Sequence, residues 1–201
     1  MRVTIFDYGA GNLHSLLKAL AGDARSVTVE TDPRAALRTD LLVLPGVGAF
    51  AAAAERLAPG RASMHDALRD GLPCLGICLG MQLLFDRSDE GAGDGLGLIR
   101  GAVTRLQATR VPHIGWNAVA DAGEALLSGT GLGLAYFANG FACRPDDSAA
   151  VTAWTTHETD RFAAVVRSAR TLGVQFHPEK SSAAGLRFVR AAVDALAGAP
   201  A

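Results

Sequence analysis

Short apolar runs alternate with amphipathic segments along residues 1–86. Turn residues bound four of these runs, which predict buried strands at 2–7, 26–30, 41–45 and 73–77. Segments with apolar residues at helical spacing lie between or after them, at 11–21, 33–38, 49–58, 61–70 and 79–86. This alternation is typical of a parallel sheet that helices cover on both faces.

The rest of the chain has a different pattern. Closely spaced strand-like runs occur with few helical stretches between them, at 98–106, 114–119, 132–138, 150–155, 162–167 and 171–176. A final amphipathic segment predicts a helix at 182–197. We therefore expect an α/β fold with a mostly parallel central sheet and some antiparallel strands in the C-terminal half. Neither a linker nor a repeat divides the chain, so we expect one domain over 1–201.

Composition excludes several classes of protein. Lys and Arg number 19 against 20 Asp and Glu, so no basic surface for nucleic acid is indicated. No apolar run has the length of a membrane span, and the N-terminus lacks the pattern of a signal peptide. Three cysteines, an odd number, indicate free thiols in a reducing compartment. We expect a cytoplasmic protein without nucleic-acid or membrane partners.

One of the cysteines, Cys78, has glycine two residues away on each side, in the segment L-G-I-C-L-G. The pattern G-x-C-x-G resembles the nucleophile elbow G-x-S-x-G, in which a strand turns sharply into a helix. A cysteine at the start of a helix is favoured as the thiolate, its reactive form. Cys78 is therefore a candidate nucleophile.

A candidate base and its orienting acid lie near the C-terminus. His177 and Glu179 are two residues apart, and Pro178 between them favours an extended backbone, which directs both side chains to the same side. A carboxylate beside an imidazole fixes its tautomer and stabilises its protonated form. Cys78, His177 and Glu179 together would make a cysteine triad.

Backbone N–H groups for an oxyanion hole come from two places. Leu79, the first helical residue after Cys78, offers one, and the segment Gly46-Val47-Gly48 offers another, because glycine lets a peptide turn its N–H into the site. Both segments follow predicted parallel strands, so they should meet at one edge of the sheet. The cysteines and histidines lack the spacing of metal ligands, and we expect neither a metal nor a cofactor.

These pieces resemble the class I, triad-type glutamine amidotransferases, which hydrolyse glutamine and pass the ammonia to a partner site. The G-x-C-x-G segment and F-H-P-E at 176–179 carry this resemblance. Further segments are similar to one branch of the family, the glutaminase subunits of imidazole glycerol phosphate synthases. They lie at 7–15, 44–50, 75–85, 95–101, 111–117 and 174–181. D-Y-G-A-G-N-L and V-P-H-I-G-W-N are typical of that branch.

The resemblance implies the three-layer class I amidotransferase fold and roles for particular residues. Cys78, His177 and Glu179 match the triad, and Gln82, Val47 and Gly48 match residues around the glutamine. The implied partner is a (β/α)₈ cyclase subunit in a heterodimer, which uses the ammonia to make imidazole glycerol phosphate and aminoimidazole carboxamide ribotide in histidine biosynthesis. The residues that match the partner interface are Asn12, His113, Trp116 and Asn117.

One segment departs from the family pattern. Where the family has Y-F-V-H-S-Y, residues 136–141 read Y-F-A-N-G-F, so Asn139 and Gly140 replace a His and a Ser that help to hold glutamine. Asn139 keeps hydrogen-bonding capacity, and Gly140 loses a hydroxyl group. We expect glutamine binding to weaken by about one hydrogen bond, roughly 1 kcal/mol.

Three alternatives remain open from the sequence. The chain could serve another amidotransferase, such as those for anthranilate, carbamoyl phosphate or guanylate, although the two branch-specific segments argue against this. It could be a stand-alone cysteine hydrolase, active without a partner. It could also be a non-enzymatic subunit that has lost glutamine binding through 138–140.

Overall fold

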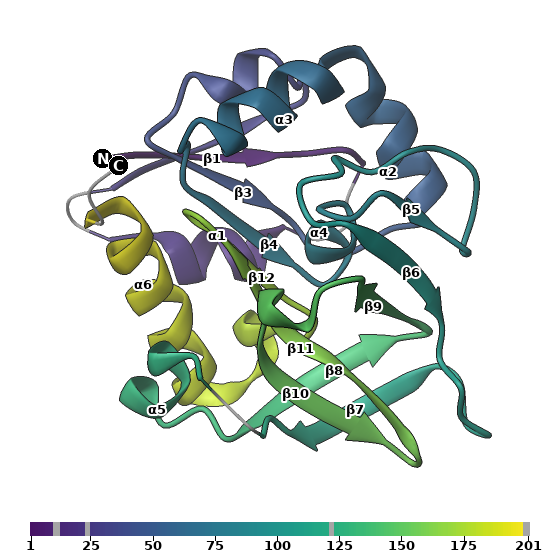
Figure 1. The fold of residues 1–201 in the computed structure, drawn as a ribbon. Coiled ribbons are helices and arrows are strands. Elements are labelled where there is room, and N and C mark those ends of the chain that lie inside the picture. The colour runs from purple at the N-terminus through teal and green to yellow at the C-terminus, as the bar shows by residue number, and fades with distance from the viewer. Residues whose placement is uncertain (10–12, 23–24, 121–122, 199–201) are drawn as a thin grey trace.

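A seven-stranded sheet forms the centre of the molecule in the computed structural model, which describes residues 1–9, 13–22, 25–120 and 123–198. Five strands are parallel to one another: β1 (Arg2–Phe6), β2 (Ser26–Glu30), β3 (Leu41–Leu44), β4 (Cys74–Ile77) and β12 (Thr171–Val174). Two antiparallel strands, β11 (Asp160–Ser168) and β10 (Val151–His157), extend the sheet beyond β12. The order across the sheet is β10-β11-β12-β4-β3-β1-β2 (Figure 1).

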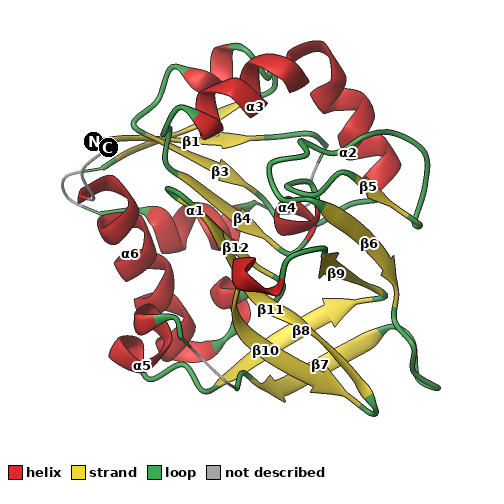
Figure 2. Ribbon diagram, viewed as in Figure 1, coloured by secondary structure: helices red, strands yellow, loops and turns green. Residues whose placement is uncertain are grey.

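Helices cover both faces of this sheet (Figure 2). Alternation along the strands explains why, because Val3, Ile5, Leu41 and Val43 join one apolar cluster and Leu42 and Leu44 the other. The first cluster includes α1 (His14–Leu20), α5 (Ala125–Thr130) and α6 (Ser182–Gly198), and the second includes α2 (Phe50–Leu57), α3 (Arg61–Arg69) and α4 (Leu79–Gln82). Single 3₁₀ turns lie at η1 (Ala35–Leu37), η2 (Ala58–Gly60), η3 (Ser148–Ala150) and η4 (Pro178–Lys180).

Two smaller sheets pack beside the central one. The first combines β5 (Arg87–Ser88), β6 (Gly101–Arg105) and β9 (Phe141–Pro145), and the second is the antiparallel pair β7 (His113–Ala118) and β8 (Leu134–Asn139). We call the second one the β7–β8 hairpin. Its inner face is buried through Phe137, whose ring packs edge-on against Phe162 and Phe176.

The strands predicted at 2–7, 26–30, 41–45 and 73–77 and the mostly parallel central sheet are confirmed, and two helical predictions are wrong in extent. The segment 33–38 contains only the 3₁₀ turn η1, and the helix expected at 79–86 stops at Gln82. The carbonyls that would have continued the helix accept hydrogen bonds from a following loop instead. The Leu96 N–H donates to the Leu83 carbonyl at 2.7 Å, and the Ile99 N–H donates to the Leu84 carbonyl at 3.0 Å. The strands β5 and β9 and the helix α5 were not predicted.

No helix in the described part of the chain combines the length and the apolar character needed to cross a membrane.

The packing of α4 on β3 generates a stability prediction. A Cβ atom on Gly80 would overlap the backbone carbonyl of Leu44, so the substitution Gly80→Ala forces two buried elements apart. We expect the free energy of unfolding to fall by about 3 kcal/mol or more.

The matched control is Gly129→Ala in α5, where an added Cβ meets nothing within 4 Å. That change should be neutral or stabilise the protein by up to about 1 kcal/mol. Urea unfolding followed by circular dichroism measures both. Equal stabilities for the two variants would contradict the packing argument.

Candidate active site

Cys78 occupies a sharp turn between β4 and α4. Its backbone has φ 47° and ψ −104°, a conformation that costs energy for any residue with a side chain. A Cβ on Gly76 would lie 2.8 Å from the carbonyl oxygen of Gly80, so both flanking glycines are needed for the turn to close. The turn has the form that the G-x-C-x-G pattern predicted. Because α4 has only one helical turn, its dipole contributes little to the charge at Cys78.

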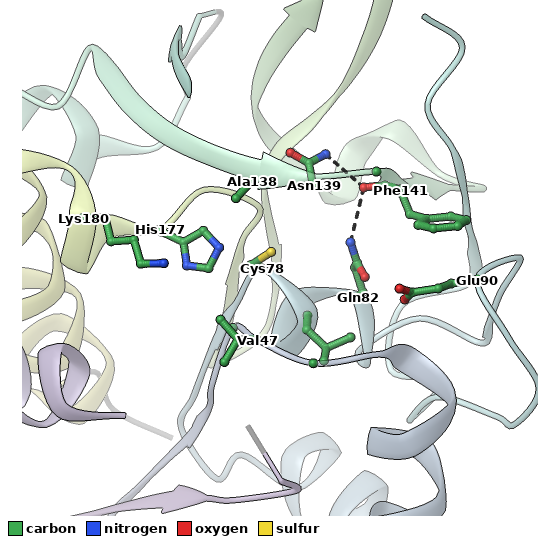
Figure 3. Close-up of a pocket in the computed structure, with 13 residues that line it drawn as sticks. Val47, Cys78, Gln82, Glu90, Ala138, Asn139, Phe141, His177 and Lys180 are labelled. Atoms are coloured by element: carbon green, nitrogen blue, oxygen red, sulfur yellow. Dashed lines mark hydrogen bonds between the residues drawn. The ribbon is translucent and has the colours of Figure 1, made fainter. Parts of the chain in front are cut away.

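His177 and Glu179 lie beside this turn, on the loop that follows β12. The His177 Nδ1 atom is 2.9 Å from Glu179 Oε1, and both side chains are nearly fully buried. Figure 3 shows the His177 ring next to the Cys78 sulfur. Burial alone would lower the pKa of His177, but the negative charge of the Cys78 thiolate and a hydrogen bond to it, followed by Glu179, outweigh burial and raise that pKa to about 10. A thiolate at Cys78 thus favours the protonated form of the imidazole.

Three further hydrogen bonds, made directly or through Ser181, hold His177 against the β7–β8 hairpin. The His177 N–H donates to the carbonyl of Tyr136 at 2.8 Å. The Ser181 hydroxyl donates to the His177 carbonyl at 2.7 Å and accepts from the Tyr136 N–H at 2.9 Å. The position of the imidazole thus depends on strand β8.

Cys78 and His177 border a cavity of about 200 Å³. This volume suits an amino acid rather than a large ligand. Predicted site residues on its wall are Val47, Gly48, Cys78, Leu79, Gln82, Asn139, Gly140 and His177. The other lining residues are Gly46, Glu90, Ala138, Phe141 and Lys180 (Figure 3). Residues from distant parts of the chain therefore meet at one edge of the sheet. This is the edge predicted from the positions at which the parallel strands end.

The far end of the cavity is rich in hydrogen-bond acceptors. Gln82 Nε2 donates to the Phe141 carbonyl and to Gln175 Oε1, both at 3.3 Å, which uses both of its hydrogens and leaves Gln82 Oε1 as an acceptor. Asn139 Nδ2 also donates to Phe141, at 3.0 Å, and Asn139 Oδ1 is buried without a hydrogen-bond partner among the described residues. The Glu90 carboxylate lies on the same wall.

Sequence reasoning missed Glu90 and Gln175. Glu90 accepts a hydrogen bond from the Phe50 N–H, the first residue of α2, at 3.0 Å, and this contact directs the loop onto the cavity. The acidic residue belongs to a segment that the sequence indicates only as a loop. The fully buried Gln175 precedes F-H-P-E by one residue, and that proximity was the available signal.

Backbone from 46–48 forms a further wall, beside His177 and Leu79. Gly48 has φ +128°, in the region that favours glycine. A Cβ on Gly46 would lie 3.1 Å from His177 Cε1, so only glycine fits comfortably beside the imidazole. The buried Tyr8 hydroxyl donates to the carbonyl of Pro45 and anchors the start of this wall. The Leu79 N–H is at the first position of α4, where no intrahelical acceptor exists.

The residues predicted as interface lie in different settings. Trp116 is 53% exposed and forms an apolar patch with its hairpin neighbours Ile114, 64% exposed, and Leu134, 60% exposed. His113, in contrast, is buried and its ring stacks on that of His157 with centroids 4.1 Å apart. Asn117 Nδ2 donates to the Thr156 carbonyl at 2.8 Å. Asn12 lies outside the described residues.

A model of the family "Glutamine amidotransferase class-I" matches residues 4–192. The chain belongs to the class I glutamine amidotransferase family. It is 42% identical to the imidazole glycerol phosphate synthase subunit HisH of Pyrococcus furiosus, over 94% of this chain and 96% of that one. It is 43% identical to the subunit of the same name from Halobacterium salinarum, over 96% and 92% of the two chains.

Solved structures support the same fold for this amidotransferase. A crystal structure of a glutamine amidotransferase superposes with a TM-score of 0.70 and 20% identity, covering 98% of this chain and 99% of that one. A PurLQS structure from Thermotoga maritima gives 0.68 and 20%, covering 97% and 98%. Such low identities establish a shared architecture alone.

The coupling between Cys78 and His177 predicts a pH dependence. The folded-state pKa of His177, about 10, lies above its unfolded value near 6.5, so its contribution to stability is complete below pH 6.5 and is lost as pH rises through 10. Removing the thiolate with Cys78→Ala should lower the His177 pKa, because burial then meets less opposition. Nuclear magnetic resonance titration of the imidazole measures this directly. An unchanged titration midpoint would sink the proposed ion pair.

Proposed function

We propose that the chain is the glutamine-hydrolysing subunit of an imidazole glycerol phosphate synthase in histidine biosynthesis, acting in the cytoplasm as a single domain. The observation that carries this proposal is the Cys78, His177 and Glu179 arrangement beside an amino-acid-sized cavity. Relatives about 42% identical over nearly the full length bear the name of that subunit.

The reaction is acyl transfer through a thioester. The Cys78 thiolate attacks the side-chain amide carbon of glutamine, and the C–N bond breaks as the His177 imidazolium gives its proton to the leaving nitrogen. Ammonia and a γ-glutamyl thioester result. The now neutral His177 takes a proton from water, hydroxide attacks the thioester, and glutamate leaves as the thiolate re-forms. Glu179 holds the imidazole in position through both steps.

Developing negative charge on the amide oxygen needs donors nearby. The Leu79 N–H and a peptide N–H of Val47 or Gly48 supply them in this proposal, since both segments line the cavity and Gly48 lies next to the Leu79 side chain. The positive φ of Gly48 lets the peptide between these residues reorient at low cost. Docking of a partner that reorients this peptide would switch hydrolysis on.

The acceptors at the far end of the cavity suit the α-ammonium group of glutamine. The Glu90 carboxylate supplies the negative charge, and Gln82 Oε1 supplies a neutral acceptor. Asn139 contributes by holding the Phe141 carbonyl at this end of the cavity through its Nδ2. Gly140 offers its backbone N–H to the α-carboxylate.

The partner in this proposal is a (β/α)₈ cyclase subunit, bound as a heterodimer through the β7–β8 hairpin. The apolar patch of Ile114, Trp116 and Leu134 supports a docking role, because exposed apolar patches mark interaction sites. His113 and Asn117 bond within the chain and would shape the hairpin beneath the partner. Neither a metal nor a cofactor takes part in the proposed reaction.

The deciding experiment is glutamate release from glutamine by the purified chain, alone and with a cyclase subunit carrying its ribulosyl ligand. We expect low activity alone and a many-fold rise with the liganded partner. Cys78→Ala should abolish glutamine use while leaving synthesis from ammonium salt intact. High activity that the partner does not change would favour a stand-alone hydrolase, and loss of the ammonium reaction would refute a role confined to glutaminolysis.

Substitution of the exposed indole tests the docking surface. We expect Trp116→Ala to weaken cyclase binding roughly thirtyfold, about 2 kcal/mol, as removal of a central aromatic anchor does. Isothermal titration calorimetry measures the dissociation constant. Val29→Ala is the control, since Val29 is 44% exposed on the edge strand β2, far from the hairpin. Equal affinities for both variants would place the interface elsewhere.

A further inference from the structure

We propose that Gln175 is a further catalytic residue of the proposed glutaminase: its side-chain amide donates a hydrogen bond to the Cys78 sulfur and holds the thiolate ionised and in place. Gln175 Nε2 lies 3.5 Å from Cys78 Sγ. The geometry alone supports the contact between Gln175 and Cys78. A role for that contact in catalysis rests on the proposed function.

Sheet register brings the two residues together. Strand β12 pairs in parallel with β4, with Val174 opposite Ile77, so the next residues, Gln175 and Cys78, follow side by side. The Cys78 N–H donates to the Val174 carbonyl at 2.7 Å and fixes this register at the sheet edge. Gln175 is completely buried, and its own N–H bonds the Ala164 carbonyl at 2.9 Å.

The direction of the contact follows from a chain of hydrogen bonds that begins at a backbone carbonyl. The Phe141 carbonyl can only accept, so it must face the Gln82 amide nitrogen. The second hydrogen on Gln82 Nε2 requires an acceptor, and that acceptor is Gln175 Oε1. With its oxygen turned to Gln82, Gln175 presents its nitrogen to the sulfur. A donor therefore faces Cys78, and a donor stabilises the thiolate over the thiol.

Burial of an amide with 0% exposure is costly unless its polar atoms are paired. Leucine or methionine would fill the same space without that cost. A buried amide at this position is therefore expected only if its hydrogen-bonding groups have a role that a hydrocarbon side chain cannot fill. Gln82 on the wall of the cavity and the nucleophile are then linked through one side chain.

Other titratable groups surround the sulfur. His177 and, behind it, Glu179 come from the loop after β12, Tyr8 from the segment after β1 and Cys143 from β9. Glu90 and Lys180 line the same cavity. The other buried cysteine, Cys74 in β4, interacts with Tyr8. Burial raises the pKa of Tyr8 and of both structural cysteines, which leaves them neutral. His177 supplies a mobile proton during the reaction, whereas the Gln175 donor cannot ionise and remains present when the thiolate re-forms.

Alkylation of Cys78 by iodoacetamide as a function of pH tests the contact without any glutaminase activity. The thiolate displaces iodide, and peptide mass spectrometry separates Cys78, which is 6% exposed, from Cys74 and Cys143, which are fully buried. Gln175→Leu keeps the volume and removes the donor. We expect the midpoint of the alkylation profile to rise by about one pH unit or more, the effect of one hydrogen bond to a charged group.

The matched control is Thr171→Val on the same strand, which removes a buried hydroxyl without a hydrogen-bond partner among the described residues. Its midpoint should not move. Gln175→Asn, which withdraws the amide by one carbon, should shift the midpoint in the same direction and serves if the leucine variant does not fold. Thiolate absorbance near 240 nm, taken as the difference from Cys78→Ser, gives an independent reading.

With the cyclase partner, the acidic limb of the pH profile of kcat/KM should shift by the same amount in Gln175→Leu. Below the midpoint, kcat/KM of Gln175→Leu should be about tenfold lower than that of the unchanged protein, and at high pH the two should be equal. A merely structural role would lower the rate at every pH and leave the limb in place.

Unchanged midpoints in both Gln175 variants would overturn the inference even if the protein is an active glutaminase. A shifted alkylation midpoint in a chain that never releases glutamate would uphold the contact and overturn the proposed function. The two failures are therefore distinguishable.

Discussion

The close approach of β3, β4 and α4 is the constraint on which the rest of the site depends. Gly76 and Gly80 let the backbone of the strand and the helix touch, and Gly80 also lies against the Leu44 carbonyl. Cys78, between them, is forced into a strained conformation at the edge of the sheet. Strain of this kind persists only where the surrounding packing determines it, and here it directs the sulfur into the cavity.

Parallel strands end at the same edge of the sheet, so the loops that follow them bring their functional groups together around that sulfur. The loop after β12 supplies the imidazole and its carboxylate, and the loop after β3 supplies glycine backbone. The thiolate that the imidazole faces favours its protonated form against the effect of burial, and no long helix behind the cysteine is needed. The charge at the site is thus set by a pair of side chains, and each member depends on the other.

Local sequence patterns were enough to predict most of the fold and the three central residues of the site. The positions of the parallel strands, the sharp turn at Cys78 and the closeness of His177 to Glu179 all follow from spacing, glycine and proline within a few residues. Glu90 could not be found that way, because its position depends on a hydrogen bond to Phe50, which is far away in sequence. Gln175 lies next to F-H-P-E, but its contact with Gln82 again joins distant parts of the chain.

The short extent of α4 and the existence of β9 have the same explanation. A loop at 95–99 captures the carbonyls that would have extended the helix, and β9 is a strand because β6 pairs with it. Neither effect leaves a local signal.

The apolar patch on the β7–β8 hairpin bears on how the protein exists in solution. Ile114, Trp116 and Leu134 place hydrocarbon and indole in contact with water on neighbouring strands. Water disfavours such a surface, and copies of the same chain can cover it as readily as any other apolar face. A surface that covered the hairpin would therefore also remove this route to self-association.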